Sequence, residues 1–392
     1  MIRPQSTNQN PASDVFTVAV IGTGTIAQEH LKFLRDESSV DLAGVCDLSA
    51  AMANHVAATF GARSTYTDYR RMLKEVQPDV VHVLTPAHTH VGIAGDCLDA
   101  GAHVIVEKPI AITRSEFEQL WTKAKRQQRI LIEDHNYRFN APILAIERLV
   151  ETGELGAVKE VDVRISLDLH DPGNRYADAN IPHSSHRLPA GVIHEFITHM
   201  AYIALRFVPQ YERVSAMWHN HGDDELFKFD DLDAIMAGPA GHAHLRFTCL
   251  TAPDTFTVTV RGTEGWAQTD LFQPYLRVVK PRRGPARLAP LFNHMTNGLE
   301  FLRSAVIGFK DKVLGRSTYE GLHRFLDLTY QALRPGTEPP VSYEDMARVL
   351  QLTEALLEPD SGSNASMVAR NRNEHETVGN RSFGLPRPVR SE

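Results

Sequence analysis

The sequence predicts an α/β protein with an N-terminal, Rossmann-type doubly wound parallel sheet and a C-terminal α+β domain with an open, mostly antiparallel sheet. Short apolar, β-branched segments alternate with helical segments from residue 15 to about 140, as they do in βαβ units. Beyond that point, several segments alternate single apolar and polar residues, a pattern typical of antiparallel strands with one solvated face. The chain also has 392 residues, which is more than one hydrophobic core usually serves.

The first half contains five predicted buried strands with helices between them. We expect the strands at residues 15–22, 41–47, 78–86, 103–109 and 129–138. The helices follow from apolar residues that recur at helical spacing, and we expect them at residues 25–36, 49–62, 68–76, 90–101 and 115–128. Residues 15–140 are therefore predicted to be a dinucleotide-binding domain.

The second half is predicted to be an α+β domain that forms oligomers, over residues 141–358. Its strands are expected at residues 158–170, 213–221, 233–250, 254–271 and 275–280, and its helices at residues 142–153, 191–205, 299–309, 319–333 and 343–357. An open sheet needs a cover on its exposed face, so we expect a homodimer or homotetramer through this face. The polar segments 1–14 and 359–392 are expected to be a mobile tail and a disordered tail.

Composition and charge exclude several classes of protein. The hydrophobic fraction of 42% and the charged fraction of 23% are those of a globular enzyme. A formal net charge of −7 without a basic patch argues against a nucleic-acid partner, and no apolar run is long enough for a membrane or a signal peptide. Cys46, Cys97 and Cys249 are isolated, which favours a cytoplasmic location over a disulfide framework.

A glycine-rich motif lies between the first predicted strand and its helix. Gly22 permits a tight turn, Gly24 lets a pyrophosphate approach the backbone, and Ala27 lets the helix pack closely on the strand. The first turn of the helix, with Thr25 and Ile26, offers free N–H groups and the positive end of the helix dipole. This motif predicts a dinucleotide site.

Asp47 ends the next strand, at about the spacing expected for a ribose-binding acid. It also precedes Leu48 and Ser49, so helix N-capping is an alternative role, and one carboxylate could serve both. A carboxylate at the ribose accepts hydrogen bonds from free hydroxyls and repels a 2′-phosphate. Because the next residue is leucine and not arginine, we predict NAD as the cofactor in preference to NADP.

Two further motifs follow successive strands: Thr85-Pro86 with His90, and Glu107-Lys108-Pro109. Their succession resembles the Gfo/Idh/MocA family of NAD(P)-dependent oxidoreductases, from about Val15 to Leu357. Members of that family pair a Rossmann domain with an open-sheet substrate domain. The resemblance implies cofactor contacts from Gly22, Gly24, Thr25, Ile26, Ala27, Asp47, Thr85, Pro86, His90, Glu107 and Lys108.

Lys108 lies at the carboxyl end of a predicted parallel strand, where doubly wound folds bind ligands. An ammonium group there can stabilise the alkoxide that develops as an alcohol loses hydride. Without the resemblance, a plain exposed turn would be the better interpretation of Lys108-Pro109. The resemblance implies that Lys108 neighbours substrate and nicotinamide, that its bond to Pro109 is often cis, and that Glu107 contacts the cofactor.

The segment 191–205 is predicted to be a buried helix that carries two ionisable groups. Glu195 and His199 are four residues apart, so they share a face and can touch. The resemblance implies that His199 is a general base and that Glu195 orients it or binds a substrate hydroxyl. This chain has glutamate where relatives have aspartate, and Pro189-Ala190-Gly191 where they have a Gly-Gly turn. A structural His–Glu pair in the helix core is the alternative.

No metal site is expected. His194-Glu195 begins like the H-E-x-x-H zinc motif, but position 198 is Thr198. His194 and His199 are five residues apart and do not share a helix face. The other histidines show no ligand spacing, and the cysteines offer no thiolate pair.

Further substrate contacts are expected beside the helix. Tyr137 and Arg138 follow the last strand of the first half. The loop 170–191 precedes the helix, and such loops often carry specificity; it contains Arg175, His183, His186 and Arg187. Arg138 or Arg187 would bind a substrate phosphate or carboxylate, whereas Arg175 is expected to be a surface residue. The predicted substrate site is Lys108, Tyr137, Arg138, Arg187, Glu195 and His199.

These features support three functional hypotheses. The first is an NAD-dependent dehydrogenase that oxidises a secondary alcohol of a sugar, cyclitol or nucleotide-linked sugar. The second is a transient-redox enzyme, in which the hydride returns after epimerisation, elimination or glycoside cleavage. The third is an NAD-binding regulator without chemistry, because a fold alone does not give a function. Net NADH production separates the first two hypotheses, and no sequence feature does.

Overall fold

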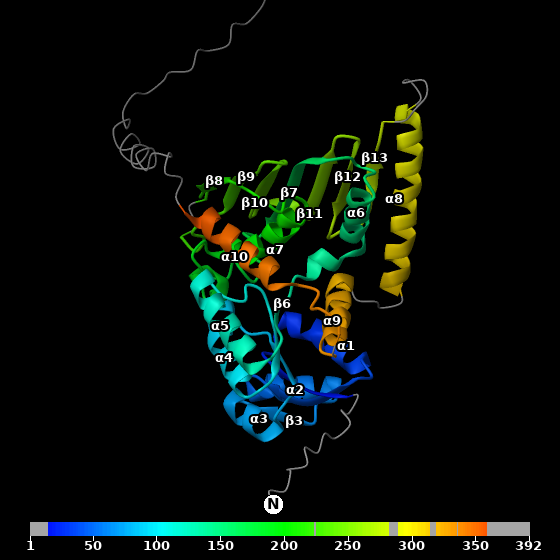
Figure 1. The fold of residues 1–392 in the computed structure, drawn as a ribbon. Coiled ribbons are helices and arrows are strands. Elements are labelled where there is room, and N and C mark those ends of the chain that lie inside the picture. Colours follow the sequence, from blue (N-terminus) through cyan, green and yellow to red (C-terminus); the bar gives the residue numbers. More distant parts are fainter. Residues whose placement is uncertain (1–14, 223–224, 282–288, 314–318, 335, 359–392) are drawn as a thin grey trace, which may run out of the picture. The chain divides into compact units, whose positions relative to one another are not determined.

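The computed structural model describes residues 15–222, 225–281, 289–313, 319–334 and 336–358 (Figure 1). The tails predicted at residues 1–14 and 359–392 lie outside the described residues. Two sheets carry the fold: a parallel one in the first half and a mixed one in the second half. The predicted fold class is thereby confirmed.

The first sheet has six parallel strands in the order β3-β2-β1-β4-β5-β6. They are β1 (Phe16–Ile21), β2 (Val40–Cys46), β3 (Ser64–Tyr66), β4 (Val80–Val83), β5 (His103–Val106) and β6 (Leu131–Glu133). The helices are α1 (Thr25–Asp36), α2 (Ala50–Phe60), α3 (Tyr69–Val76), α4 (His90–Asp99) and α5 (Arg114–Gln127). The strand order reverses between β1 and β4, so ligands are expected at the carboxyl ends of these two strands.

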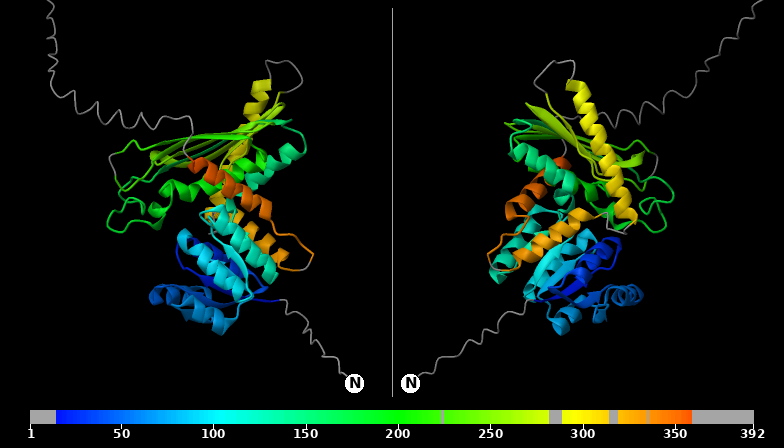
Figure 2. Two further views of the ribbon diagram at one scale, coloured as in Figure 1. Left: turned by 60° about the vertical axis from the view of Figure 1, so that its left-hand side comes forward. Right: turned by 90° about the vertical axis from the view of Figure 1, so that its right-hand side faces the viewer.

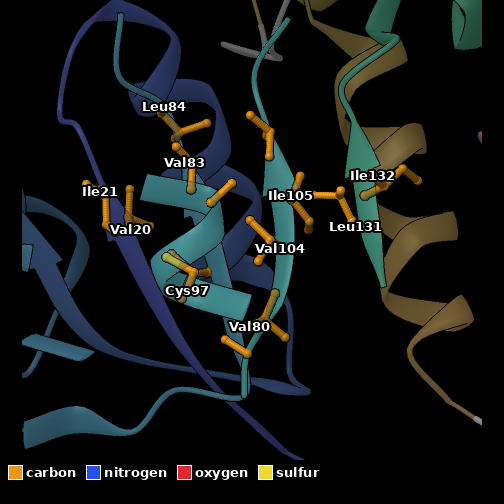
Figure 3. Close-up of a cluster of buried hydrophobic side chains, with 14 of the residues drawn as sticks. Val20, Ile21, Val80, Val83, Leu84, Cys97, Val104, Ile105, Leu131 and Ile132 are labelled. Carbon is orange, nitrogen blue, oxygen red and sulfur yellow. The ribbon is translucent and has the colours of Figure 1, made fainter. Parts of the chain in front are cut away.

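The central strands are mostly apolar because helices cover both faces of the sheet. Figure 3 shows aliphatic side chains of β1, β4, β5 and β6 packed together with Cys97 of α4. Burying each such side chain contributes about 1.5–3 kcal/mol. The sequence missed β3, a three-residue edge strand without full burial, because so short a segment carries no apolar run.

The second sheet has seven strands in the order β13-β12-β11-β7-β10-β9-β8. They are β7 (Val158–Asp168), β8 (Arg213–His219), β9 (Asp231–Ala237), β10 (His242–Thr248), β11 (Leu250–Gly262), β12 (Gly265–Asp270) and β13 (Arg277–Val279). Every neighbouring pair is antiparallel except β7–β10, which is parallel. Helices α6 (Ala141–Glu151) and α7 (Val192–Phe207) pack on one face, and the other face exposes Met217 and Ile235.

The late helices are α8 (Ala289–Val313), α9 (Glu320–Ala332) and α10 (Tyr343–Leu357). Helix α8 runs beside β13 at the edge of the second sheet (Figures 1 and 2). Helix α9, which we expected in the second domain, packs on α1, and its Leu322 and Phe325 join the hydrophobic cluster of the first sheet. The described residues up to Leu357 form one compact unit, and the domain boundary at residue 140 stays a prediction. None of the described helices is both long and apolar enough to cross a membrane.

Candidate active site

A cavity of about 1350 Å³ opens at the point where the strand order of the first sheet reverses. Its lining comes from the loops after β1, β2, β4 and β5, from helix α7 and from the loop before that helix. Single small-molecule pockets usually measure roughly 300–1,000 Å³. The cavity therefore has room for a dinucleotide and a second ligand.

The glycine loop forms one end of the cavity. Gly22 has φ +92°, and a Cβ atom there would lie 2.5 Å from the carbonyl oxygen of Leu84. Gly24 has open space where a side chain would be, so a ligand can approach its backbone. Thr25 and Ile26 also line the cavity. Ala27 is fully buried and does not line it, so its predicted packing role fits the structure and a direct cofactor contact does not.

Asp47 lies at the rim of the cavity, directly after β2. Its Oδ2 accepts hydrogen bonds from the backbone N–H of Thr23 (3.0 Å) and from the Thr23 hydroxyl (2.7 Å). Its Oδ1 accepts from the backbone N–H of Ser49 at 2.9 Å. The N-cap of α2 is Ser49, which accepts from Met52, so the alternative of Asp47 as the helix N-cap is wrong. The carboxylate instead fixes the glycine loop to the end of β2.

Thr85 and Pro86 line the cavity after β4, but His90 does not. The two ring nitrogens of His90 lie 2.6 Å from the carbonyl oxygen of Thr85 and 2.8 Å from that of Pro109. The predicted cofactor contact of His90 is therefore corrected, because both nitrogens are occupied by backbone oxygens. His90 ties the loop after β4 to the loop after β5.

Lys108 brings the end of β5 into contact with helix α7. Its Nζ donates a hydrogen bond to the backbone oxygen of Glu195 at 3.1 Å and lies 3.7 Å from Glu195 Oε1. The side chain is only 12% exposed, so the alternative of a plain exposed turn is wrong. The Lys108–Pro109 bond is cis, as the resemblance implied. Glu107 also lines the cavity and is 7% exposed.

Glu195 and His199 lie on α7 and both line the cavity, yet they form no hydrogen bond with each other among the described residues. Glu195 faces Lys108, and its Oε2 lies 3.8 Å from Nδ1 of His183. Burial alone would raise the pKa of Glu195, but Lys108 and His183 hold it below its usual value. The expected His–Glu contact is thus wrong, because each side chain has another partner at closer range.

His199 is held by a chain of hydrogen bonds from the turn η2 (Asn136–Phe139). Its Nδ1 lies 2.8 Å from the hydroxyl of Tyr202, which donates to Asn136 Oδ1 at 3.1 Å. The backbone N–H of Tyr137 donates to the same Oδ1 at 2.9 Å, which identifies that atom as the amide oxygen. When the Tyr202 hydroxyl donates to Asn136, Nδ1 of His199 donates to Tyr202 and Nε2 is left as an acceptor.

The charge state of His199 follows from its surroundings. Burial, followed by the nearby Lys108 ammonium and by His135, holds the pKa of His199 well below its usual value. The ring is therefore neutral around pH 7 and can take up a proton at Nε2. Tyr137 packs edge-on against this ring at 4.8 Å and lines the cavity, as predicted for a substrate neighbour.

The arginines are placed differently from the prediction. Arg138 pairs with Asp345 at 3.0 Å and does not line the cavity, because the short η2 turn directs neighbouring side chains to different sides. Arg187 is exposed and also lies outside the cavity lining. Arg175 is exposed, as expected of a surface residue, but it also lines the cavity and donates to the Tyr176 hydroxyl at 2.7 Å. The cation available to an anionic substituent is therefore Arg175.

Several polar residues around the substrate end of the cavity were not named by the sequence analysis, and they are Asn174, Tyr176, Ser185, Asp254 and Tyr319. The first three lie in the loop before α7, and their place in that loop was their only signal. Asp254 and Tyr319 come from two segments far away in the chain, so no local spacing marks them. His183 also lines the cavity; its position in the loop before α7 was the only signal for it.

The fold and the cavity together define a Rossmann-type dinucleotide-binding protein with a second, substrate-facing half. Residues 16–135 match the family described as "Oxidoreductase family, NAD-binding Rossmann fold". This part of the chain is therefore similar to the NAD-binding domain of the Gfo/Idh/MocA oxidoreductases. NAD is the cofactor of this Rossmann domain, as the sequence predicts.

Curated relatives are similar over part of their length. D-glucoside 3-dehydrogenase of Escherichia coli (strain K12) is 31% identical over 162 residues, which cover 41% of this chain and 46% of that protein. D-apiose dehydrogenase of Paraburkholderia graminis is 28% identical over 141 residues, with 36% and 38% covered. The chain thus spans about half, or less, of the length of these relatives.

Solved structures resemble the chain over most of both lengths. Levoglucosan dehydrogenase in complex with NADH and levoglucosan has a TM-score of 0.69 at 18% identity, with 87% of this chain and 96% of that chain covered. The WlbA dehydrogenase from Bordetella pertussis, in complex with NADH and UDP-GlcNAcA, has a TM-score of 0.67 at 19% identity, with 87% and 94% covered. At these identities the likeness shows that the two-sheet fold is shared.

Proposed function

We propose that the protein is an NAD-dependent dehydrogenase that oxidises a secondary alcohol of a sugar, cyclitol or nucleotide-linked sugar. One observation carries this proposal. Lys108 from the first half and His199 from the second half line the same cavity as the glycine loop. An ammonium donor and a neutral imidazole acceptor are the two groups that alcohol oxidation needs beside a dinucleotide.

The division of work follows from the contacts of each side chain. Bound NAD supplies the hydride acceptor. Nε2 of His199 takes the hydroxyl proton, because Nδ1 already carries a hydrogen that is donated to Tyr202. Among the residues that the structure describes, Nζ of Lys108 donates a hydrogen bond only to the backbone oxygen of Glu195, so it can also donate to the substrate oxygen and stabilise negative charge there. The Glu195 carboxylate holds Lys108 in position and balances its charge.

A polyhydroxylated substrate fits the substrate end of the cavity. Tyr176, His183, Ser185 and Glu195 offer both donors and acceptors there, as hydroxyl recognition requires. The relatives' names support the same class, since they are dehydrogenases of a glucoside, apiose and levoglucosan. Arg175 is the residue that would bind a carboxylate or phosphate substituent.

A single-turnover experiment tests the proposal. Protein in excess over NAD is mixed in turn with neutral sugars, cyclitols, sugar acids and nucleotide-sugars, and the absorbance of reduced nicotinamide is followed. A signal that rises and stays is expected for one class of substrate. A signal that rises and falls while product accumulates would instead mean transient redox. Silence across the panel, with NAD binding confirmed, would contradict the proposal and favour a regulator.

Assembly and location are also proposals. A homodimer or homotetramer would cover the face of the second sheet that exposes Met217 and Ile235, since an uncovered sheet face with apolar residues favours association. Sedimentation measures the mass of the wild-type protein and of Met217→Glu, which should dissociate the oligomer. An unchanged mass for the variant would contradict this interface. The three cysteines are free and buried, and the cytoplasmic location stays a prediction.

A further inference from the structure

A buried group of three metal-binding side chains lies beneath the floor of the cavity. His30 comes from α1, Glu107 follows β5 and Asp134 follows β6. His30 Nε2 lies 3.6 Å from Asp134 Oδ2 and 4.0 Å from Glu107 Oε1. One ligand atom from each residue lies within 4.8 Å of the others, and all three residues are buried. The three come together only because α1, β5 and β6 meet at one edge of the sheet.

The facing atoms in this group have no protein partner. Among the described residues, Nε2 of His30 and both carboxylate oxygens of Asp134 form no hydrogen bond. His30 is 0% exposed and Asp134 is 1% exposed. Two carboxyl groups buried this deeply are strongly unfavourable unless a cation or a donor compensates them. A bound cation, or a proton on one of the two carboxyl groups, provides that compensation.

The contacts behind His30 fix which of its nitrogens faces the carboxylates. Its Nδ1 lies 2.9 Å from Nδ1 of His82, whose Nε2 lies 2.9 Å from the hydroxyl of Tyr330. With the hydrogen on Nδ1 of His30, that nitrogen donates to His82, and Nε2 presents a lone pair to the carboxylates. In the other tautomer, an N–H on Nε2 would find its nearest carboxylate oxygen at 3.6 Å, too far for a hydrogen bond. A histidine that donates through its second nitrogen is typical of metal ligands.

The distances suit a small divalent cation. Zinc–nitrogen and zinc–oxygen bonds of about 2.0–2.2 Å place tetrahedral ligands roughly 3.4 Å apart. The separations of 3.6 and 4.0 Å, in a group whose ligand atoms all lie within 4.8 Å of one another, are longer than this, so the side chains must move towards the ion when it binds. One imidazole with two carboxylates suits zinc and similar ions, and the two negative charges balance a dication. Glu107 also lines the cavity, which gives the ion a path of entry.

We propose that His30, Glu107 and Asp134 bind a divalent cation of the zinc class beneath the cavity floor. The ion joins α1 to the ends of β5 and β6. Because it holds Glu107, it also fixes the backbone at Lys108. The sequence predicted no metal, since the ligands come from three separate segments and form no local motif. This site goes beyond the proposed function and does not depend on it.

Metal titration of the full-length, chelator-treated protein tests the site in the absence of NAD. Zinc chloride is titrated by calorimetry, and cobalt chloride is titrated while visible absorption is recorded. We expect one site per chain and the strong d–d bands of four-coordinate cobalt. Asp134→Asn and His30→Gln should each weaken binding at least about tenfold, because each removes one ligand. Asp99→Asn is the control, since the Asp99 side chain is 49% exposed and pairs with Lys123. The zinc affinity of this variant should equal that of the wild type.

Three results would overturn the site. The first is the absence of saturable zinc binding, as expected if a bound water and a proton on one carboxyl group satisfy the three side chains. The second is equal affinity in Asp134→Asn and wild type, which would move the ion elsewhere, for instance to His219 at the end of β8 and the neighbouring His221. The third is a pale, six-coordinate cobalt spectrum. Should both variants fail to fold, the cobalt spectrum of the unmutated protein decides.

Discussion

The two ends of the cavity are built differently. At the nucleotide end, the backbone carries the site: Gly22 has a positive φ, and Asp47 holds the backbone N–H of Thr23. At the substrate end, side chains carry it, since Lys108 and His199 meet a ligand through single atoms. Ligand binding at the nucleotide end therefore depends on backbone conformation, whereas the chemistry at the substrate end depends on charge and on the position of protons. Substitutions at the two ends should change different measured quantities.

The largest loss of activity is expected from substitution of Lys108. Lys108→Ala removes the donor for the alkoxide oxygen, so kcat should fall about 10²–10³-fold, as for loss of one oxyanion donor. The affinity for NAD should change less than about threefold, because the donor acts in the transition state. Steady-state kinetics and NAD titration measure the two quantities. Lys123→Ala, which removes an exposed lysine paired with Asp99, is the control. An unchanged kcat would contradict the role of Lys108.

Gly22→Ala should act at the opposite end. The added Cβ atom would lie 2.5 Å from a backbone oxygen, at a φ of +92° that side chains rarely adopt. We expect the affinity for NAD to fall at least about tenfold and the free energy of unfolding to fall by about 1–3 kcal/mol. Kinetics at saturating NAD should be nearly normal. Gly298→Ala, where nothing lies within 4 Å of the new Cβ, should leave NAD affinity unchanged. Equal NAD affinity in the two variants would show that the loop does not require glycine.

Tyr202→Phe tests the proton placement at the substrate end. Without the hydroxyl, Nδ1 of His199 loses its 2.8 Å partner, so the tautomer with a free Nε2 is no longer favoured. One lost hydrogen bond of roughly 1.4 kcal/mol lowers kcat about tenfold, while KM and NAD affinity stay the same. Tyr343→Phe, which breaks a bond to Glu118, is the control. A purely structural role would instead lower thermal stability and leave kcat unchanged.

The nucleotide end of the cavity was predictable from the sequence, because its residues lie at the ends of individual strands that the sequence predicts. Gly22, Gly24 and Asp47 each follow a predicted strand, and strand ends of a parallel sheet converge on one edge. Lys108 follows the same rule, so the sequence located it without knowledge of its partners. The short edge strand β3 was missed because three partly exposed residues give no periodic signal.

The residues of the substrate end could be predicted only in part. Glu195 and His199 were identified from their helix and from the resemblance, but their partners were not. Lys108 and Asn136 come from other elements, and Tyr202, although it lies on α7 itself, gave no separate signal. Arg138 was misplaced because a short turn, unlike a strand, does not fix the side to which a residue points. Side-chain networks between distant segments leave no spacing to detect.

A smaller effect on kcat/KM is expected from a change of pH. Burial, followed by Lys108, lowers the pKa of His199, so the base stays neutral until the pH falls through that lowered value. Between pH 7.5 and pH 6, kcat/KM should change less than about twofold, whereas an unshifted histidine of pKa about 6.5 would lose about fourfold. Activity is thus present above the lowered pKa and is lost only in stronger acid. A fourfold decline above pH 6 in the kcat/KM profile would contradict the shift.

The smallest effect is expected from a substitution of Asp47 at the nucleotide end. There, the charge of the side chain can be changed while its hydrogen bonds to the glycine loop are kept. Asp47→Asn keeps an oxygen that can accept from Thr23 and removes only the negative charge that repels a 2′-phosphate. We expect NAD affinity to fall about threefold and NADP affinity to rise by a similar factor, which is the size of one weak, exposed charge interaction. Fluorescence titration with NADH and NADPH measures both affinities. Asp41→Asn, which removes an exposed acid paired with Arg63, controls for net charge. If the ratio of the two affinities stays at the wild-type value in Asp47→Asn, the carboxylate holds the loop and does not select the cofactor.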